Sequence, residues 1–229
     1  STSRKAIRYA VIGLGHIAQS VVLPAFANAK RNSVLAALVS GNARKRKQLG
    51  RHYDVPAYDY SEVEDLFAGG EIDAVYIALP NDQHKEYTIA AARAGLHVLC
   101  EKPMAVTARE CEQMIRATND ASVKLMIAYR LHLERATLEA IEIARSGKLG
   151  DLRYFGSDFS MQVSDDNIRL NPVEKGGGPL YDIGIYCLNA ARYCFDQDPI
   201  EVFATATKSS DRRFRKVDET IAAVMRFKD

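Results

Sequence analysis

The sequence predicts an α/β domain with a parallel sheet, followed by an α+β domain with a mostly antiparallel open sheet. Up to about residue 128, short apolar runs alternate with helical patterns of about 10 to 15 residues, which is typical of βαβ units. After Tyr129 the chain has one long polar connection and then successive strand patterns, which favours antiparallel pairing. We therefore expect a first domain over residues 1–130 and a second over residues 131–229.

The elements of the first domain follow from hydrophobic periodicity and from helix start and stop signals. The predicted strands are Ile7–Ile12, Val34–Val39, Asp73–Leu79, His97–Cys100 and Lys124–Ala128. The predicted helices are 16–29, Ala43–Tyr53, Ser61–Phe67, Asp82–Ala94 and Thr107–Asn119. Pro24 should kink the first helix. Ser61, with a glutamate three residues later, should form a capping box.

The second domain is expected to mix helices with longer strands. The predicted helices are Leu133–Arg145 and Pro179–Phe195, and the predicted strands are Leu152–Val163, Ile200–Thr207 and Thr220–Phe227. A polar, glycine-rich loop over Val163–Gly178 should connect the first strand to the second helix.

Composition argues against nucleic acid and membrane partners. The 229 residues include 31 Lys and Arg against 29 Asp and Glu, for a net charge of +2. No apolar run reaches the roughly 18 residues of a membrane helix, and no apolar signal core precedes the first strand. We expect a cytoplasmic protein, or a periplasmic one if a signal was removed before residue 1. Scattered histidines and four cysteines without a CxxC pair predict free thiols and no metal site.

A dinucleotide-binding fingerprint follows the first strand. The segment Gly13-Leu14-Gly15-His16-Ile17-Ala18 has the pattern G-x-G-x-x-A and opens a helix. Gly13 permits the tight turn, Gly15 lets the backbone approach a pyrophosphate, and Ala18 permits close packing of helix and strand. A glycine turn in another α/β protein is the alternative, but the strand and helix on either side favour a Rossmann domain.

The end of the second strand indicates which dinucleotide is bound. An NAD site usually has a carboxylate there, whereas this chain has Ser40 followed by the basic run Arg44–Lys47. A hydroxyl and cations accommodate the 2′-phosphate of NADP, which a carboxylate would repel. Part of the basic run must be a solvated helix face. A nucleic-acid patch is a third interpretation, which the balanced charge of the chain disfavours.

Lys102 follows the strand His97–Cys100, at the sheet edge where α/β enzymes bind ligands. It could donate to a substrate oxygen beside the nicotinamide, although an ordinary salt bridge is the alternative. The Lys102-Pro103 peptide bond is a candidate for the cis form.

Four motifs in order resemble one known family. They are the G-x-G-x-x-A start, Leu79-Pro80-Asn81-Asp82-Gln83-His84, Glu101-Lys102-Pro103, and Gly176-Gly177-Gly178-Pro179-Leu180-Tyr181-Asp182-Ile183-Gly184-Ile185-Tyr186. Over essentially the whole chain they resemble the glucose–fructose oxidoreductase / inositol dehydrogenase / rhizopine catabolism family, written Gfo/Idh/MocA. The stretch Val39–Ala43 and Tyr186 look most like the glucose–fructose oxidoreductase branch, because many other members carry histidine where this chain has Tyr186.

The resemblance implies an NADP-dependent sugar oxidoreductase, with a ping-pong cycle on tightly held NADP as in that branch. It implies that Ser40 and Lys45 hold the 2′-phosphate. The implied cofactor-binding residues are Gly13, Gly15, His16, Ile17, Ser40, Gly41, Asn42, Lys45, Leu79, Pro80, Asn81, His84, Glu101 and Lys102. The implied catalytic residues are Lys102, Asp182 and Tyr186, which with Arg130 would also contact the substrate.

The proposed chemistry is hydride transfer between nicotinamide C4 and C1 of an aldose or a related carbon. Asp182 and Tyr186, four residues apart, should face the same side of one helix. Tyr186 would be the acid or base, Lys102 the cation that favours its phenolate form, and Asp182 the residue that orients a hydroxyl or Lys102. Glycines 176–178 should let their loop approach the ligand. Without the resemblance, Tyr186 is read as a core tyrosine.

Other functions stay open at this point. One is an NADP-linked reductase or dehydrogenase of a polyol, an anhydrosugar, xylose or a dihydrodiol, and another is a non-catalytic NADP(H)-sensing protein. A DNA-binding regulator would rest on Arg44–Lys47 alone. Family members normally continue through further sheet strands, so the resemblance implies that the second domain is incomplete in this sequence. It also implies a dimer or tetramer through that sheet.

Overall fold

The computed structural model describes residues 6–228, which divide between Ala128 and Tyr129 into two compact units. Each unit is described by itself. No helix in these residues is long and apolar enough to cross a membrane.

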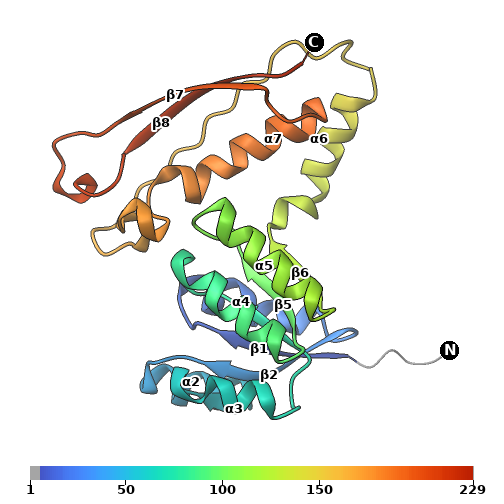
Figure 1. Cartoon of the computed structure of the whole chain (residues 1–229), viewed down its shortest axis with the longest axis vertical. Helices are drawn as coiled ribbons and strands as arrows, with labels where there is room; N and C mark the ends of the chain where they lie inside the picture. The colour runs from blue at the N-terminus through green and yellow to red at the C-terminus, as the bar shows by residue number, and fades with distance from the viewer. Residues whose placement is uncertain (1–5, 229) are drawn as a thin grey trace. The chain divides into compact units, whose positions relative to one another are not determined.

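The first unit contains a six-stranded, fully parallel sheet (Figure 1). Its strands are β1 (Ile7–Ile12), β2 (Ser33–Val39), β3 (Ala57–Tyr58), β4 (Ala74–Ile77), β5 (His97–Glu101) and β6 (Leu125–Ala128). The spatial order is β3-β2-β1-β4-β5-β6, which is the order of dinucleotide-binding folds. The order of the strands reverses between β1 and β4, and such folds bind their ligand at this switch point. The predicted parallel sheet is confirmed, with the two-residue β3 added.

Helices cover both faces of this sheet. They are α1 (Leu23–Ala25), α2 (Ala43–Tyr53), α3 (Val63–Ala68), α4 (His84–Arg93) and α5 (Ala108–Asp120). One core joins α3, α4 and α5 to alternate strand residues such as Ile12 and Ile77, and α4 and α5 lie side by side (Figure 1). A second core packs the helix after β1 and part of α2 against Val11 and Leu38. Because successive strand residues point to opposite faces, β1, β2 and β4 contribute residues to both cores.

The helix after β1 departs from regular α geometry more than predicted. It is π-helical over Ala18–Val22, α-helical over Leu23–Ala25 and 3-10 helical over Phe26–Asn28. Pro24 has no amide hydrogen to donate, and the amide of Leu23 instead reaches back to the Ala18 carbonyl. The predicted irregularity at Pro24 is therefore a change of helix type that begins before the proline.

The capping box predicted at Ser61 is wrong. A 3-10 turn, Tyr60–Glu62, precedes α3, and its N-cap is Asp59. The Asp59 carboxylate accepts a hydrogen bond from the Ser61 amide at 3.3 Å, and the Glu62 carboxylate accepts one from the Asp59 amide at 2.6 Å. The capping pair is thus shifted two residues toward the N-terminus, because Asp59 is a charged acceptor that Arg46 also holds.

The second unit combines two helices with a long hairpin. A π-helical turn, Leu180–Gly184, leads into α7 (Ile185–Phe195), which packs against α6 (Arg135–Arg145). Strands β7 (Glu201–Thr207) and β8 (Thr220–Arg226) form a two-stranded antiparallel sheet. Short 3-10 turns cover 130–132, 168–170, 173–175 and 212–214. The predicted antiparallel pairing is confirmed.

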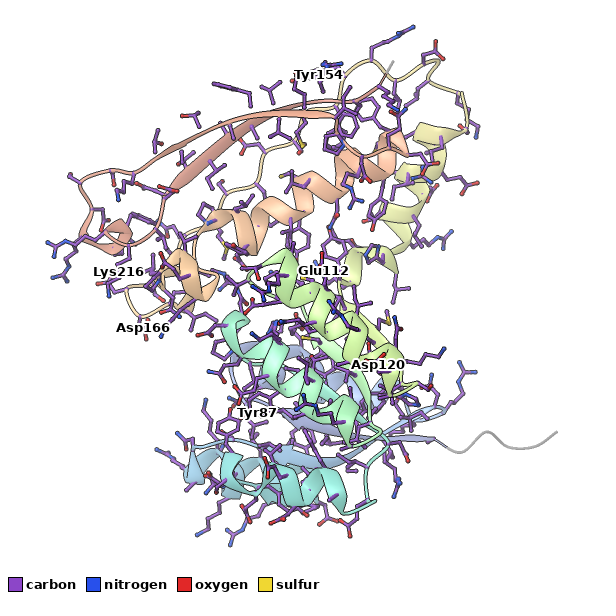
Figure 2. The ribbon with its side chains drawn as sticks, in the orientation of Figure 1. Tyr87, Glu112, Asp120, Tyr154, Asp166 and Lys216 are labelled. Carbon is purple, nitrogen blue, oxygen red and sulfur yellow. The ribbon has the colours of Figure 1, made fainter. Side chains whose placement is uncertain are left out.

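The strand predicted over Leu152–Val163 is wrong. This segment carries no strand, and within the described chain β7 pairs with β8 alone. An alternating sequence becomes a strand only where a neighbouring strand supplies hydrogen-bond partners. Tyr154, marked in Figure 2, is 86% exposed, so the alternation does not bury an apolar face here.

Candidate active site

The glycine loop after β1 has the geometry that the fingerprint predicts. Gly13 has φ +93°, and a Cβ there would lie 2.5 Å from the Ala78 carbonyl oxygen, so no other residue fits. Gly15 is exposed, and a Cβ built on it meets nothing within 4 Å. Ala18 is fully buried in the second core. The loop is therefore fixed at Gly13 and leaves open space at Gly15, which suits a bound pyrophosphate.

The loop after β2 holds a hydroxyl where NAD-binding folds usually have a carboxylate. Ser40 is 6% exposed, and its Oγ accepts a hydrogen bond from the Asn42 amide at 3.2 Å. Asn42 caps α2, because its side-chain oxygen accepts from the Lys45 amide at 3.0 Å. A Cβ on Gly41 would lie 3.3 Å from the Tyr60 ring, so this turn is closely packed. Ser40, Asn42 and Lys45 thus form one local structure at the end of the strand.

Lys45 and Arg46 have different partners. The Nζ of Lys45 donates to the Leu14 carbonyl at 2.9 Å, which brings its charge to the glycine loop. Arg46 donates to the Ser40 carbonyl and to the Asp59 carboxylate, each at 2.5 Å. The Ser61 amide and the Arg46 charge hold the pKa of Asp59 below its usual value. Arg44 and Lys47 are exposed. Of the basic run, Lys45 is the residue whose charge lies beside the predicted cofactor loop.

The loops after β4 and β5 leave the sheet at the same edge. Leu79 is 7% exposed, and the Lys102-Pro103 peptide bond is cis, as the sequence suggested. The carboxylate of Glu101 accepts from the Tyr76 hydroxyl at 2.6 Å and from the Lys102 amide at 3.3 Å. Burial, followed by the Glu101 charge, raises the pKa of Tyr76. Glu101 therefore shapes the turn that carries Lys102, which sequence reasoning did not anticipate.

The remaining predicted cofactor residues differ in exposure. His16 and Ile17, in the first turn after the glycine loop, are exposed, and the His16 ring lies 3.3 Å from the Ser20 hydroxyl. Pro80 and Asn81 are partly buried. His84 is fully buried, with one ring nitrogen against the Leu79 carbonyl and the other against the Pro103 carbonyl. Its ring has no free nitrogen for a cofactor, so any effect of His84 on the cofactor is indirect.

In the second unit, Asp182 and Tyr186 lie on one continuous helix. Asp182 is in the π-helical turn and Tyr186 in the first turn of α7. Asp182 forms an ion pair with Arg169, and its side chain is 14% exposed. Tyr186 stacks on Tyr129, with ring centroids 5.2 Å apart. Arg130, next to Tyr129 in the chain, is exposed.

Two of these neighbours were missed from the sequence. Arg169 lies in the loop that was predicted only as polar and glycine-rich, and only the charge of its side chain hinted at a partner. Tyr129 was taken as a domain boundary, yet it is 5% exposed and packs on Tyr186. Burial raises the pKa of Tyr129, and a hydrogen bond with Asn189 opposes this in part. Tyr129 therefore stays a neutral ring beside Tyr186.

The glycine loop before Asp182 packs closely against neighbouring backbone, and its approach to a ligand stays a prediction. A Cβ on Gly177 would lie 1.8 Å from the Asn171 carbonyl oxygen, so the glycine is required by a neighbouring backbone segment. Gly176 and Gly178 have φ of +75° and +96°. The Gly178 amide also donates to the Arg169 carbonyl at 2.8 Å. The loop thus packs against the turn that carries Arg169.

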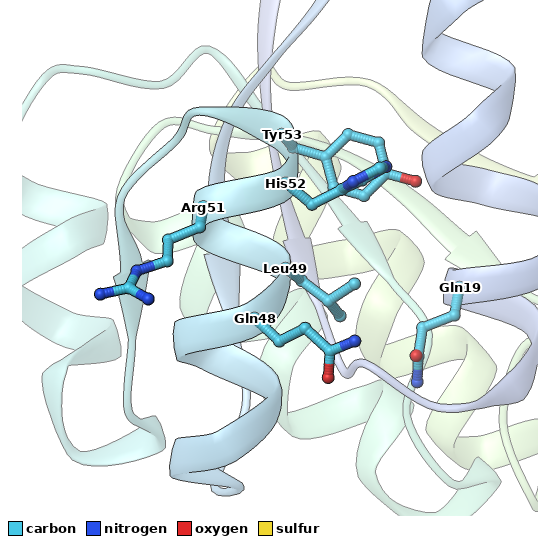
Figure 3. A pocket seen from close by; sticks show the side chains of 6 residues that line it. All are labelled: Gln19, Gln48, Leu49, Arg51, His52 and Tyr53. Atoms are coloured by element: carbon cyan, nitrogen blue, oxygen red, sulfur yellow. The ribbon is translucent and has the colours of Figure 1, made fainter.

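A hollow in the first unit lies outside this set of residues. Gln19 and the α2 residues Gln48, Leu49, Arg51, His52 and Tyr53 line a space of about 510 Å³ (Figure 3). None of the predicted site residues lines it. Within residues 6–228, no group of three or more His, Cys, Asp and Glu side chains is arranged to hold a metal ion.

Each of the two units matches a model of a known protein family. Residues 7–129 match the family model described as an oxidoreductase family with an NAD-binding Rossmann fold, and residues 137–229 match the GFO/IDH/MocA C-terminal domain. The chain is 34% identical over 221 residues to D-xylose 1-dehydrogenase (NADP(+)) 2 of Haloferax volcanii, covering 96% of this chain and 65% of the relative.

Two solved structures are similar in fold and sequence. Aldose-aldose oxidoreductase from Caulobacter crescentus, complexed with glycerol, gives a TM-score of 0.87 at 40% identity, covering 96% of this chain and 67% of that one. KijD10, a 3-ketoreductase from Actinomadura kijaniata in complex with NADP and TDP-benzene, gives a TM-score of 0.85 at 27% identity. The match covers 96% of this chain and 66% of that one. The chain spans 57 to 65% of the length of three curated relatives, including the xylose dehydrogenase.

Proposed function

Because this chain belongs to the Gfo/Idh/MocA oxidoreductase family, we propose that it is an NADP-dependent sugar oxidoreductase. One observation supports NADP over NAD as the cofactor. The buried Ser40 stands at the end of β2, and the Lys45 ammonium lies beside the glycine loop. This hydroxyl and cation suit a 2′-phosphate, and no carboxylate at the strand end repels it. The NADP named for the xylose dehydrogenase and for the KijD10 complex agrees with this proposal.

The two units would bind different molecules. Residues 1–130 would bind NADP, through the glycine loop, the β2 end and the loops after β4 and β5. Residues 131–229 would bind the substrate and contribute to oligomerisation. The exposed apolar side chains of the hairpin, such as Phe203 at 74% and Val224 at 71%, support a partner surface there. The expected assembly is a dimer or tetramer. A cytoplasmic location stays a prediction from the sequence.

The cofactor, when bound, would supply the redox chemistry, with NADP⁺ as hydride acceptor in oxidation of the substrate and NADPH as hydride donor in reduction. The residues of this chain would handle the proton and the orientation. Tyr186 would take the proton of the reacting hydroxyl in oxidation and return it in reduction. Lys102 would donate to the substrate oxygen and carry positive charge beside the nicotinamide. Asp182, which Arg169 holds, would orient a sugar hydroxyl, and Arg130 would contact the substrate.

The proposed substrate is an aldose that reacts at C1. The names of the aldose-aldose oxidoreductase and the xylose dehydrogenase support a sugar carbon as the reacting centre. A second enzymatic candidate is reduction or oxidation of another polyol, an anhydrosugar or a dihydrodiol. The relatives that favour it are 1,5-anhydro-D-fructose reductase of Ensifer adhaerens and the dihydrodiol dehydrogenase of Bos taurus. A panel of these substrates, assayed with NADP and with NADPH, separates the candidates.

The first experiment is to denature the purified protein and identify any released nucleotide by absorbance and chromatography. Stoichiometric NADP(H) supports the assignment and favours a ping-pong cycle with a resident cofactor. Protein without nucleotide that binds added NADP favours a dehydrogenase that exchanges its cofactor in each turnover. NADP binding without turnover of any substrate in the panel favours a sensing protein. Folded protein that binds no NADP at all would contradict the proposal.

A further inference from the structure

His84 connects the two loops that leave the sheet after β4 and β5. Its Nε2 lies 2.9 Å from the carbonyl oxygen of Leu79, and its Nδ1 lies 2.8 Å from that of Pro103. Strands β4 and β5 are neighbours, with Ile77 paired to Cys100. Both loops therefore begin at the same edge of the sheet, and the imidazole lies between their backbones.

The backbone beside His84 has two carbonyl groups that need a hydrogen-bond donor. Both carbonyls belong to residues beyond the ends of the strands, where no ladder supplies a donor. His84 is fully buried at the start of α4, so the core around it fixes the ring. A ring nitrogen that carries a proton donates to the carbonyl that it faces, so a ring with one proton donates to one carbonyl and packs its other nitrogen against the second. A single side chain thus sets the spacing of two loops that otherwise share no regular pairing.

One of these loops presents Lys102. The Lys102 amide donates to Glu101, and Glu101 accepts from Tyr76, so the first half of the turn is held from the strand side. The contact between His84 and the Pro103 carbonyl holds the second half. Lys102 therefore lies between two anchored points. Loss of either anchor would let its backbone shift.

We propose that His84 is a positioning residue, which holds the Leu79 and Pro103 loops together and thereby fixes Lys102 for hydride transfer. This inference rests on the proposed function for the role of Lys102, whereas the connection between the loops stands on the geometry alone. Ser40 and Lys45 lie on another part of the unit, after β2 and in α2. Removing the imidazole should therefore affect turnover and leave the preference for NADP over NAD unchanged.

The test compares two variants of His84 with a buried control in the full chain. His84→Phe fills the space of the ring without a nitrogen, and His84→Gln keeps a donor that can reach one carbonyl. Thr88→Val is the control, because Thr88 is equally buried one turn later in α4. Amide hydrogen exchange, the NADP and NAD dissociation constants, and kcat and KM are measured for each.

We expect exchange to rise in residues 79–83 and 102–105 together in H84F, and less in H84Q. We expect kcat to fall by about tenfold or more in H84F and by less in H84Q, since small displacements of a catalytic group have large effects on rate. The ratio of NADP to NAD affinity should not change. Thr88→Val should leave both loops and kcat as in the wild type at a similar melting temperature.

If amide hydrogen exchange in H84F rises in one loop only, or in neither, His84 does not hold the Leu79 and Pro103 loops together. A T88V variant with the same loss of kcat would reduce His84 to a general stabilising role. If the wild-type protein neither binds NADP nor turns over a sugar, the proposed function fails, but the exchange measurements still decide whether His84 joins the loops. If H84F does not fold, H84Q carries the same comparison.

Discussion

Arg169 and Asp182 form an ion pair within the second unit, thirteen residues apart in the chain. The Arg169 side chain is 37% exposed and that of Asp182 is 14% exposed, so the carboxylate is the more shielded partner. The Arg169 carbonyl also accepts from the Gly178 amide, which joins the same turn to the glycine loop. Arg169 is thus the residue through which the polar loop is coupled to the proposed catalytic helix.

Arg169→Met should impair turnover by releasing Asp182. Loss of the guanidinium leaves a shielded carboxylate without this partner, which should reorient. We expect Arg169→Met to lower kcat/KM for the sugar by about tenfold or more. Arg169→Lys should lower kcat/KM less, because it keeps the positive charge although it lacks the planar guanidinium fork. NADP affinity should be unchanged. Arg153→Met, in an exposed pair with Asp151, is the control. If R169M and the wild type have equal kcat/KM, the ion pair with Arg169 does not position Asp182 for turnover.

Tyr186→Phe should remove the proposed acid and base while keeping the aromatic stack on Tyr129. General acid–base groups contribute about 10²- to 10⁴-fold to rate, so kcat should fall within that range at unchanged NADP affinity. Tyr193→Phe is the control on the same helix, since the Tyr193 hydroxyl bonds His132 instead. Steady-state assays with the preferred sugar measure the effect. Wild-type turnover in Y186F would end the assignment.

Ser40→Asp should shift the preference from NADP toward NAD. A carboxylate at this buried position would repel the 2′-phosphate and could bond the ribose hydroxyl of NAD. A repulsion of about 1.4 kcal/mol already weakens NADP binding about tenfold. Fluorescence titrations with both nucleotides measure the ratio. Ser33→Asp, at the opposite end of β2, should leave it unchanged. An unaltered ratio in S40D would place the 2′-phosphate elsewhere.

Gly177→Ala should destabilise the protein because the new Cβ would lie 1.8 Å from the Asn171 carbonyl oxygen. Neighbouring backbone has to move, and we expect a loss of about 1–3 kcal/mol in the free energy of unfolding. Gly15→Ala is the matched case, since a Cβ there meets open space. It should leave stability unchanged and weaken NADP binding. Denaturant melts of both variants decide the point, and a fully stable G177A would disprove the close packing.

Asp59→Asn should lower stability at neutral pH and not at low pH. The pKa of Asp59 lies below its usual value, chiefly through the Ser61 amide and then the Arg46 charge. Its contribution is therefore present above the unfolded value of about 3.9 and is lost as the pH falls through the folded value. Melting temperatures of D59N and wild type should differ at pH 7 and converge below about pH 4. Asp151→Asn, at an exposed side chain, is the control.

The parallel sheet and the cofactor loop could be predicted from the amino-acid sequence alone, because both depend on local requirements. Apolar runs that end at glycine form buried strands, and the positive φ of Gly13 admits no side chain, whatever the rest of the chain does. Ser40 and Lys45 are likewise fixed by their places in one capped turn. These local features were predictable from the sequence, whereas the contact between the Lys45 ammonium and the Leu14 carbonyl depends on tertiary packing.

Tertiary structure decided what each side chain touches. Leu152–Val163 was predicted as a strand, but among residues 6–228 it has no neighbouring strand to pair with. The capping role predicted for Ser61 belongs to Asp59. His84 looked like a cofactor ligand in the sequence, yet packing places its ring between two backbone carbonyls. Arg169 reaches Asp182 across a loop whose conformation the sequence does not encode locally. Periodicity reports which face of an element is apolar, whereas partners distant in the chain are set only when the elements pack.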